Sequence, residues 1–512
     1  PIYSIAMEDD GLWLNGRWRV EGVQRTDLID AGPEGVSGWT RRQQRSPSVV
    51  CPDGWCTARL SVESGRVLRI KDMAAVPPLP SRLRSLGLSP GVAIEGGDPA
   101  FAASLQAQVA QILMGTVADE TRPGDPTNYP LPWLRDGAFA IVALVRAGRV
   151  DAAEVLVEQL VHRDFFGGFG AEADAPGLAL WAIGTVSRAK ASLAFDQRMW
   201  PHVFRKVELI QSMQATREAL TAGFDGPIVP AYRGRNFWLV AEPAVDGLIN
   251  GRMDWHRPRV FVSAVSARGL QEAARIAGSV GEEHWRDEWS QSHGLLETAV
   301  RTAVASGVEL DNSRTLAVAL DPTGVAGGLP QFREALEANW LATRDDSGGF
   351  RSAPLWTYFE LAKSRQWLHL GRPDRTRATV EWFWRHSPAP GLYTLWEGSG
   401  EENSLGRWPK VRGWVSPPHV TPHYWASAEM LMTQLSMLAL VDREKVLIGA
   451  GVPPEWLNGV IQVSGLVTDL GRVSWQWNGR HLTVDFCGPS AAIQPAGAFA
   501  RFEVVTRRSG CT

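Results

Sequence analysis

The middle of this sequence consists of helical segments of two alternating kinds, from about Ala100 to Val441. Amphipathic segments, with polar residues along one face, are expected at residues 101–116, 150–161, 192–220, 283–304, 330–343 and 374–384. Segments richer in alanine, glycine and apolar residues alternate with them, at residues 135–147, 175–187, 259–277, 312–320, 354–370 and 422–440. A helix that is apolar on all sides is buried, so the alternation predicts six inner helices covered by six outer ones.

The segment at 312–320 is the weakest of the set, and without it five pairs would remain. Regular helical repeats fit less well, because the spacing varies and long loops precede the inner helices. We therefore expect a closed (α/α)6 barrel of helical hairpins.

Both flanks of the helical region are predicted to be β-rich. The N-terminal part contains short alternating stretches at 12–20 and 57–70, followed by a proline-rich, linker-like stretch at 76–80. Near the C-terminus, Asn478-Gly479 separates two alternating stretches, which predicts a β-hairpin with a type I′ turn. The expected fold is thus mainly α, with a β-rich N-terminal segment over 1–95, the barrel over 96–445 and a small C-terminal β-module over 446–512.

Charge and composition exclude several classes of protein. The 52 Lys and Arg residues against 55 Asp and Glu residues give a formal net charge of −3, which provides no electrostatic footprint for nucleic acid. No apolar run reaches the roughly 18 residues of a transmembrane helix, so no membrane association is expected. Tryptophan is abundant, with 23 residues against 6 Tyr. Indole faces suit the C–H faces of sugars, but they also fill a large core.

The cysteines leave the cellular compartment open. Cys51-Pro-Asp-Gly-Trp-Cys56 could close a small disulfide loop, which would indicate an oxidising compartment, or both thiols could be free. The sequence begins with Pro1, which is compatible with a processed N-terminus. Cytoplasmic and exported locations, periplasmic or secreted, are both open, and so is the oligomeric state.

Four loops that precede inner helices are rich in residues that could do chemistry. The first contains Trp133, Arg135 and Asp136, which offer a stacking plane, a bidentate donor and an acceptor together. In the second, Asp174 is predicted to cap the following helix, whereas Glu172 is freer to face a cavity.

The third loop is dense in ionisable residues, namely Glu242, Asp246, Arg252, Asp254, His256 and Arg257, together with Trp255. The fourth contains Trp396, Glu397, Glu401 and Glu402 and is followed by His419, His423, Tyr424 and Trp425.

In this order, Trp-Leu-Arg-Asp, the acidic third loop and Leu-Trp-Glu resemble the six-hairpin (α/α)6 glycosidases over about residues 100–440. The glucoamylase family is the most similar in layout, and trehalases and α-rhamnosidases are more distant. The resemblance implies that Trp133, Arg135 and Asp136 hold the terminal sugar. It also implies a general acid ahead of the triplet Arg268-Gly269-Leu270, which Asp254 matches in spacing. The Glu-Glu pair of the glucoamylases is here Met253-Asp254, a departure that leaves the substrate open, although aspartate is the usual acid in the trehalase-like branch.

The resemblance further implies that Glu397 is the general base. An inverting enzyme needs a protonated acid and, about 6.5–9.5 Å away, a carboxylate that activates water. We therefore expect Asp254 to have a raised pKa and Glu397 to be ionised at neutral pH. Glu242 or Asp246 could replace Asp254 as the acid, and Glu401 or Glu402 could replace Glu397 as the base.

The expected pocket walls are aromatic, comprising Trp133, Trp238, Trp255, Trp356, Tyr358, Trp396 and Trp425. The other expected substrate-binding residues are Arg135, Asp136, Glu172, Glu242, Asp246, His256, Arg257, Glu402 and His423. Trp382 and Trp384 are predicted to pack an outer helix, and the loop at 345–350 is predicted to be a turn, since it lacks the ligands of a calcium site. No metal or cofactor is expected.

The favoured function is an inverting, exo-acting glycoside hydrolase for an α-linked oligo- or polysaccharide. An alternative keeps the barrel but processes uronic acids, as an unsaturated uronyl hydrolase or a polysaccharide lyase. There, Tyr358 or His423-Tyr424 would serve as the base, and Arg135, Arg252 and Arg257 would hold a carboxylate. A third possibility is a non-catalytic glycan-binding protein.

Overall fold

The computed structural model describes residues 2–33, 46–51, 56–74, 81–86, 91–124, 129, 131–167, 170–222, 238–388, 391–399, 420–489 and 491–508. The chain divides into two compact units, Pro1–Pro80 with Lys410–Gly413 and Ser81–Pro409 with Trp414–Thr512. The division therefore falls after Pro80 rather than near residue 95, and the linker-like stretch at 76–80 lies outside the described residues.

The smaller unit is built from β-strands. Its five-stranded sheet has the order β5-β1-β2-β3-β7, with β1 at Ser4–Glu8, β2 at Gly11–Leu14, β3 at Trp18–Glu21, β5 at Ser48–Val50 and β7 at Arg69–Asp72. A separate antiparallel pair joins β4 (Leu28–Pro33) to β6 (Cys56–Leu60). Alternate residues of β1, Ile5 and Met7, are buried in its core, as expected for a half-buried strand.

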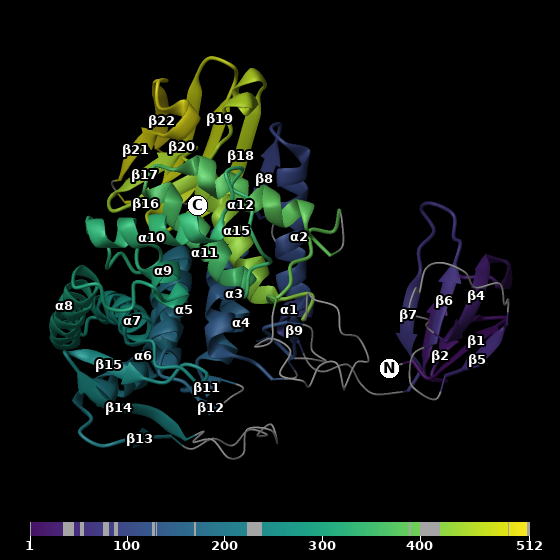
Figure 1. The fold of residues 1–512 in the computed structure, drawn as a ribbon, viewed down its shortest axis with the longest axis horizontal. Coiled ribbons are helices and arrows are strands. Elements are labelled where there is room, and N and C mark those ends of the chain that lie inside the picture. The colour runs from purple at the N-terminus through teal and green to yellow at the C-terminus, as the bar shows by residue number, and fades with distance from the viewer. Residues whose placement is uncertain are drawn as a thin grey trace. The chain divides into compact units, whose positions relative to one another are not determined.

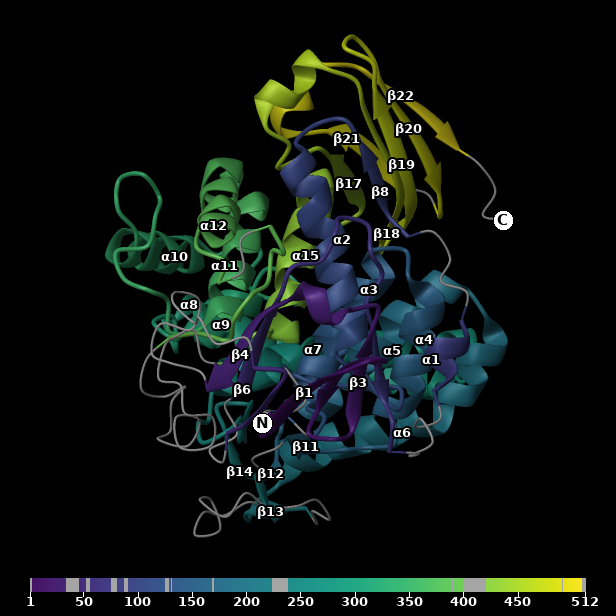
Figure 2. The same ribbon diagram turned by 90° about the vertical axis from the view of Figure 1, so that its right-hand side faces the viewer.

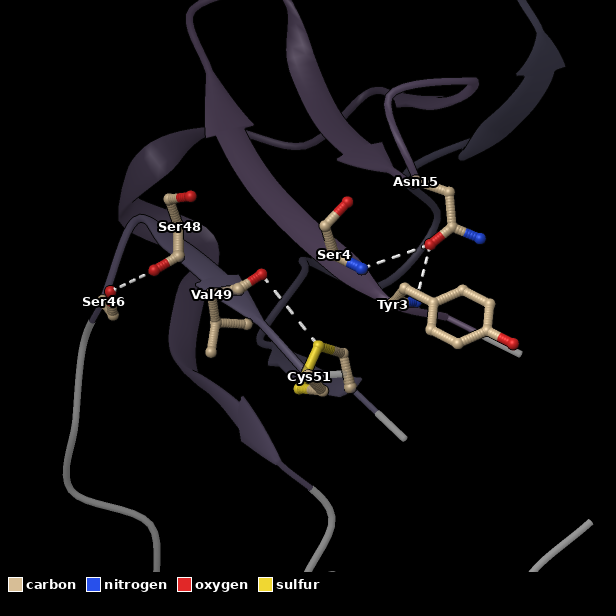
Figure 3. Close-up of a disulfide and its surroundings, with 8 residues drawn as sticks. Tyr3, Ser4, Asn15, Ser46, Ser48, Val49 and Cys51 are labelled. Carbon is tan, nitrogen blue, oxygen red and sulfur yellow. Dashed lines mark hydrogen bonds between the residues drawn. A yellow bond between two sulfur atoms is a disulfide. The ribbon is translucent and has the colours of Figure 1, made fainter. Parts of the chain in front are cut away.

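A disulfide between Cys51 and Cys56 closes the loop between β5 and β6, with the two Cα atoms 5.4 Å apart (Figure 3). Of the two alternatives left open by the sequence, the structure has the bridge. Nearby, the Asn15 side-chain oxygen accepts hydrogen bonds from the backbone N–H groups of Tyr3 and Ser4, which ties the β2–β3 turn to the start of β1.

The larger unit contains the helices, and both predicted kinds are present. The amphipathic helices are α2 (Pro99–Met114), α4 (Val150–Leu160), α6 (Leu193–Ala215), α8 (Glu283–Ala305), α10 (Pro330–Thr343) and α12 (Pro373–Arg385). The buried helices are α3 (Leu134–Arg146), α5 (Ala175–Lys190), α7 (Arg259–Ser279), α9 (Ser313–Val318), α11 (Thr357–His369) and α15 (Tyr424–Leu438). A further short helix, α1 (Arg82–Ser85), precedes them. The expected mainly α fold with a β-rich N-terminal region is confirmed.

Burial separates the two kinds of helix. Every residue of α15 is buried, and α3 is buried from Leu134 to Val145. In contrast, α8 buries a single face of its 23 residues. The buried helices pack in sequence, α3 on α5, α5 on α7, α7 on α9, α9 on α11 and α11 on α15, and α15 also packs on α3. Figures 1 and 2 show the amphipathic helices outside this set.

Glycine permits the closest approach within the set of buried helices. A Cβ atom on Gly269 of α7 would lie 2.6 Å from the backbone oxygen of Gly177 in α5. A Cβ atom on Gly177 would lie 2.7 Å from the Cα of Ser266. The two backbones thus meet directly, which no larger residue allows.

The C-terminal strands lie beyond the C-terminal ends of the buried helices (Figures 1 and 2). A three-stranded sheet has the order β16-β17-β21, with β16 at Ala439–Asp442, β17 at Lys445–Ile448 and β21 at Ala492–Pro495. A five-stranded sheet has the order β22-β20-β19-β18-β8, with β8 at Ala93–Glu95, β18 at Ile461–Thr468, β19 at Gly471–Trp477, β20 at Leu482–Cys487 and β22 at Val504–Arg508.

The β19–β20 hairpin turns at Asn478-Gly479, as predicted, but the turn is not type I′, because Gly479 has a positive φ and Asn478 does not, and the loop spans residues 478–481. Its register pairs Trp477 with Leu482, and the Asn478 side-chain oxygen accepts hydrogen bonds from the backbone N–H groups of Arg480 and His481.

Short strands lie at the opposite end of the helices, where the buried helices begin. They are β9 (Thr116–Val117), β10 (Glu120–Thr121), β11 (Phe166–Gly167), β12 (Gly170–Ala171), β13 (Leu220–Thr221), β14 (Leu239–Val245) and β15 (Leu248–Gly251). β12 leads into α5 and β15 leads into α7, so these strands hold the loops that precede two buried helices. Across the described ranges, no helix has the length and apolar character needed to span a bilayer.

Candidate functional site

The buried helices begin with residues that the sequence analysis singled out. Trp133 is the N-cap residue of α3, Trp356 that of α11 and His423 that of α15. The His423 side chain accepts a hydrogen bond from the backbone N–H of Ala426 and so caps its helix. Five of the six buried helices are followed by an outer one, and the sixth, α15, packs on the outer helix α2 that precedes the set. The N-terminal ends of the buried helices therefore share one end of the unit.

Arg135 is the centre of an acidic cluster at this end. Its Nη1 lies 2.5 Å from Oε2 of Glu172 and 2.8 Å from Oδ2 of Asp174, and its Nη2 lies 3.0 Å from Oδ1 of Asp254. The side chains of Arg135, Glu172 and Asp174 are 4%, 2% and 0% exposed, whereas that of Asp254 is 20% exposed. The guanidinium therefore holds three carboxylates from two other loops, and Asp254 is the member of the cluster that solvent reaches.

Asp174 differs from its expected role. It occupies the N-cap position of α5, but its backbone is helical and its side chain makes no capping hydrogen bond. The carboxylate instead pairs with Arg135. A charge-assisted hydrogen bond to Arg135 is stronger than a hydrogen bond to a backbone N–H. The prediction that Asp174 caps α5 was therefore wrong.

The loop between β15 and α7 presents Asp254. Backbone hydrogen bonds join Met253 and His256 in both directions at 2.9 Å, and Asp254 has a left-handed φ of 53° inside this turn. Aspartate tolerates that conformation better than most residues do, yet it still costs about 1–2 kcal/mol. The buried Met253 side chain and the two backbone hydrogen bonds fix the position of this turn.

Glu397 comes from the segment before α15 and is fixed by its backbone on both sides. Its N–H donates to the carbonyl of Val420 at 3.1 Å, and its carbonyl accepts from the N–H of Thr357 at 2.8 Å. The Tyr129 hydroxyl donates to Oε1 of Glu397 at 2.6 Å, and Nε2 of His423 lies 4.0 Å from the same oxygen. The carboxylate is buried, being 7% exposed as a residue.

A stack of rings connects the acidic cluster to Glu397. The Arg135 guanidinium lies over the Trp425 ring at 5.7 Å, Trp425 stacks on Tyr358 at 4.0 Å, and Tyr358 stacks on His423 at 5.4 Å. The Tyr358 hydroxyl has its pKa raised by burial and then by the charges of Glu397 and Asp254. The charges of Asp254 and Glu397 thus both raise the pKa of the Tyr358 hydroxyl, and the Asp254 charge also raises the pKa of Glu397.

The charge state of Glu397 differs from the expectation. Burial raises its pKa to about 8, and the negative charges of Asp136 and Asp254 add to the rise, against the opposing Tyr129 hydrogen bond. Asp136 is itself buried, and burial raises its pKa to about 7. Glu397 is therefore mostly protonated at neutral pH and ionises above about pH 8, so the expectation of an ionised base at neutral pH was wrong.

The charge state of Asp254 also differs. Burial would raise its pKa, but Arg135, Arg314 and a hydrogen bond with Glu172 outweigh burial and hold the pKa below its ordinary value. Burial raises the pKa of Glu172 far above its ordinary value. Such a pair titrates as one system, and the opposite directions of the two shifts favour a proton on Glu172 over one on Asp254.

Of the remaining predicted residues, some lie near Asp254 or the ring stack and others do not. Trp133 packs edge-on against Tyr129 at 5.0 Å and Trp356 lies 5.7 Å from Tyr358, so both rings belong to the site. Trp255 and His256 adjoin Asp254 and are half-buried. Glu402, like Glu401, lies outside the described residues.

Other predicted residues lie away from the ring stack. Glu242 forms an ion pair with Arg257, and both side chains are substantially exposed. Asp246 lies in the β14–β15 turn with its side chain 81% exposed. Trp238 is exposed directly before β14.

The tryptophans near α12 have packing roles. Trp396 contacts Phe383 at 5.5 Å, and Trp382 stacks on His386 at 4.0 Å. The indole N–H of Trp384 donates to Ser104 at 2.8 Å. Trp396 therefore faces an outer helix, unlike the pocket-lining role predicted for it.

The sequence analysis missed two residues of the site, Tyr129 and Arg314. Tyr129 lies four residues before Trp133 in the first loop but was not selected, because a tyrosine followed by proline is common in ordinary loops. Arg314 opens α9, the weakest predicted helix; its guanidinium lies over the Phe359 ring at 5.5 Å, and its charge lowers the pKa of Asp254. An arginine in the first turn, two residues after the cap residue Asn312, was the available signal.

Within the described ranges, no group of three His, Cys, Asp or Glu residues is arranged to hold a metal ion. The Asp345 carboxylate accepts hydrogen bonds from the backbone N–H groups of Ser347 and Gly349, which makes the loop at 345–350 a turn.

Several solved structures share this fold. The GH78 rhamnosidase of Bacillus sp. GL1 matches with a TM-score of 0.55 and 12% identity, over 99% of this chain and 53% of that one. The α-L-rhamnosidase of Streptomyces avermitilis, complexed with L-rhamnose, matches with a TM-score of 0.50 and 13% identity, over 93% and 45% of the two chains. The resemblance to six-hairpin glycosidases is confirmed at the level of the fold. This chain spans about half the length of these two proteins.

A bacterial glucoamylase complexed with acarbose matches at a TM-score of 0.45 and 11% identity, over 85% of this chain and 74% of that one. No protein-family model and no curated protein sequence matches the chain.

Proposed function

We propose that this chain is an inverting glycoside hydrolase whose six buried helices close into an (α/α)6 barrel. The packing of α15 on both α11 and α3 supports the closure. One observation carries the activity: Asp254 and Glu397 come from separate loops, act on the same aromatic ring stack, and differ in whether they hold a proton. Hydrolysis with inversion requires one protonated and one ionised carboxyl group. The pKa shifts are the reverse of the proposed roles, so the mechanism needs a proton to reach Asp254 from Glu172 and needs Glu397 to lose its own proton.

Asp254 is the proposed general acid. As the solvent-reached member of the Arg135 cluster, it receives the proton stored on Glu172 and delivers it to the glycosidic oxygen. The bond from that oxygen to the anomeric carbon then breaks, and the leaving sugar departs as an alcohol. Arg135 keeps the three carboxylates together throughout, which makes it a positioning residue rather than a direct ligand of the sugar.

Glu397 is the proposed general base. Once ionised, it takes a proton from a water molecule whose oxygen attacks the anomeric carbon from the opposite face. The Tyr129 hydroxyl stabilises the ionised form through its 2.6 Å hydrogen bond. Because the pKa of Glu397 is about 8, we expect kcat/KM to rise with pH until about that value.

The proposed substrate is an α-linked oligo- or polysaccharide that is cleaved from its end. The rings of Trp133 and Trp356 offer stacking faces for it, whereas Trp425 is enclosed by Tyr358 and Arg135. The two rhamnosidase structures make aryl α-L-rhamnosides the first compounds to test, with aryl α-glucosides beside them.

The uronic-acid alternative has less support. Burial lowers the pKa of His423 to about 3 and raises that of Tyr358, so neither readily accepts a proton from a sugar carbon in its present surroundings. Arg135 and Arg257 already pair with carboxylates of the chain.

The test compares Asp254→Asn and Glu397→Gln with Asp246→Asn and Glu242→Gln, which change exposed carboxylates in the neighbouring loop. We expect the first two to lose about 10²–10⁴-fold in kcat, and the controls to keep it. With a dinitrophenyl leaving group, which needs no protonation, Asp254→Asn should recover activity and Glu397→Gln should not. Recovery in Glu397→Gln alone would reverse the two roles, and full activity in either variant would remove that residue from the mechanism.

A second measurement tests the stereochemistry. Proton NMR of the first product should show the anomer opposite to that of the substrate, and a retained anomer would contradict the proposed water attack.

A further inference from the structure

A buried group of charges in the middle of the larger unit has no part in the proposed mechanism. The side chains of Arg365 in α11 and Glu429 in α15 are each 1% exposed, and Nη1 of Arg365 lies 2.5 Å from Oε2 of Glu429. Nε of Arg365 lies 2.5 Å from Oδ2 of Asp321, which follows α9. These charges thus connect α11 and α15 with the segment after α9.

Stability alone gives no reason for this arrangement. Burial of each ion carries a large desolvation cost, and apolar residues of similar volume often make a fold at least as stable as a buried ion pair does. In this pair, burial raises the pKa of Glu429, whereas Arg365 and a hydrogen bond from Trp425 act in the opposite direction. In some proteins, buried polar groups specify one arrangement of their neighbours at this cost. The second partner of Glu429 indicates which neighbour is arranged here.

That second partner is the indole of Trp425. The two residues are four positions apart on α15, so their side chains lie on the same face of the helix. Nε1 of Trp425 donates to Oε1 of Glu429 at 3.2 Å. The carboxylate therefore uses one oxygen for Arg365 and the other for Trp425. Because the indole has a single N–H, this hydrogen bond fixes the rotation of its ring.

The Trp425 ring contacts both halves of the proposed catalytic site. The Arg135 guanidinium lies over it at 5.7 Å, and Tyr358 stacks on it with a centroid distance of 4.0 Å and an angle of 15° between the ring planes. Arg135 in turn pairs with Asp254, and Tyr358 stacks on His423. A rotation of the indole would therefore move groups on which the catalytic carboxylates depend.

We propose that Glu429 is a positioning residue, which fixes the Trp425 ring and, through it, the places of Arg135 and Tyr358 in the catalytic site. The inference rests on the proposed function, because it concerns the arrangement that the hydrolysis requires. With a side chain that is 1% exposed, Glu429 itself is out of reach of a substrate, so its effect on the reaction passes through Trp425.

Glu429→Gln is the first variant to test. Glutamine has one acceptor oxygen where the carboxylate has two, so either the indole N–H or Arg365 loses its acceptor. We expect kcat to fall about 10- to 100-fold, because small misplacements of catalytic groups reduce rates by this order. KM should change less, since Trp425 is enclosed by Tyr358 and Arg135. Steady-state kinetics with the aryl glycoside that the unmodified chain hydrolyses fastest give both values.

The same change in a Trp425→Phe background tests whether Glu429 acts through Trp425. Phenylalanine keeps an aromatic ring but has no N–H, so the glutamine oxygen can then serve Arg365. In that background, Glu429→Gln should change kcat by less than about twofold. If the losses of the two single variants instead multiply in the double variant, Glu429 acts independently of Trp425 and the proposal fails.

Gln434→Leu is the matched control for the loss of a buried polar group from α15. Gln434 bonds to α2 instead of the ring stack, with Nε2 donating to the carbonyl of Phe101 at 3.0 Å and Oε1 accepting from the Ser104 hydroxyl at 3.2 Å. The variant should have a lower melting temperature and an unchanged kcat. A loss of kcat equal to that of Glu429→Gln would show that any loosening of α15 reduces activity, which would overturn the proposal.

Proton NMR of the indole N–H groups provides a measurement that does not need catalysis. The Trp425 resonance is identified by its absence in Trp425→Phe. It should move upfield in Glu429→Gln, because a neutral amide accepts a weaker hydrogen bond than a carboxylate. An unmoved resonance would overturn the proposal whatever the kinetics show. If the unmodified chain hydrolyses no glycoside, the proposed function fails, and this resonance still decides whether Glu429 holds Trp425.

Discussion

At the residue scale, Tyr129 has the most direct control over the proposed chemistry. Its hydroxyl is the neutral donor that favours the charged form of Glu397, while burial and two neighbouring carboxylates favour the neutral form. Enzymes commonly set a catalytic pKa through such opposing effects. The balance places the ionisation of Glu397 slightly above neutrality.

Tyr129→Phe should therefore raise the pKa of Glu397 further. Loss of one hydrogen bond to the carboxylate favours protonation, so the rising limb of the kcat/KM profile should move to higher pH by about one unit. The pH–rate profile measures this shift, with Tyr393→Phe as the control. An unmoved limb would mean that Glu397 does not govern it.

Glu172→Gln tests whether Glu172 supplies the proton. Glutamine has the shape of the protonated carboxyl and can keep the hydrogen bond to Asp254, but it cannot release a proton. We expect kcat for a poor leaving group to fall about 10²-fold, and kcat for a dinitrophenyl glycoside to change much less. Equal losses on the two substrates would point to a structural role for Glu172 instead.

At the element scale, the sequence predicted the helices well because their signal is periodic burial. The buried helices are apolar on every side and the outer ones are apolar along one face. Both patterns can be recognised in the sequence without tertiary information. The shortest of the six buried helices, α9 with 6 residues, is the one predicted weakly, since so short a segment has little periodicity.

The candidate site was less predictable for a physical reason. Local sequence indicated that Asp254 and Glu397 lie at helix N-terminal ends, but not which charges surround them. The fate of Asp174 depended on Arg135, which lies 39 residues earlier in the chain. The reversed protonation of Asp254 and Glu397 follows from the same long-range neighbours, which spacing along the chain does not reveal.

Gly269→Ala tests the contact between α5 and α7. The added Cβ would lie 2.6 Å from a backbone oxygen, so the helices must separate, at a cost of about 1–3 kcal/mol in the free energy of unfolding. Gly294→Ala in α8 is the matched control, because its Cβ meets no atom within 4 Å and alanine should stabilise that helix by about 0.5–1 kcal/mol. Chemical denaturation measures both, and equal effects would contradict the close approach.

At the scale of the whole molecule, the site affects stability. The pKa of Glu397 is about 8 in the folded chain against an ordinary value of 4.5. Between those two values the unfolded chain has already lost the proton that the folded chain retains, so stability falls as pH rises through this window.

Glu397→Gln should therefore stabilise the protein at pH 8. The variant has no carboxyl group to ionise, so its melting temperature should exceed that of the unmodified chain at pH 8 and match it near pH 4. Melting curves at both pH values test this, and a variant that is less stable at pH 8 would show that burial of Glu397 carries no such cost.

The pairing of β8 with β18 has a consequence for biosynthesis. Residues 93–95 form the edge strand β8, and they pair with Gln462 to Ser464 of β18. Likewise, α15 packs on α2 and α3, the first helices of the larger unit to be synthesised after α1. On the ribosome, these early segments must wait for partners that emerge only near the end of translation. Until then their apolar surfaces stay uncovered, so the nascent chain is exposed to aggregation and to chaperone binding for most of its synthesis.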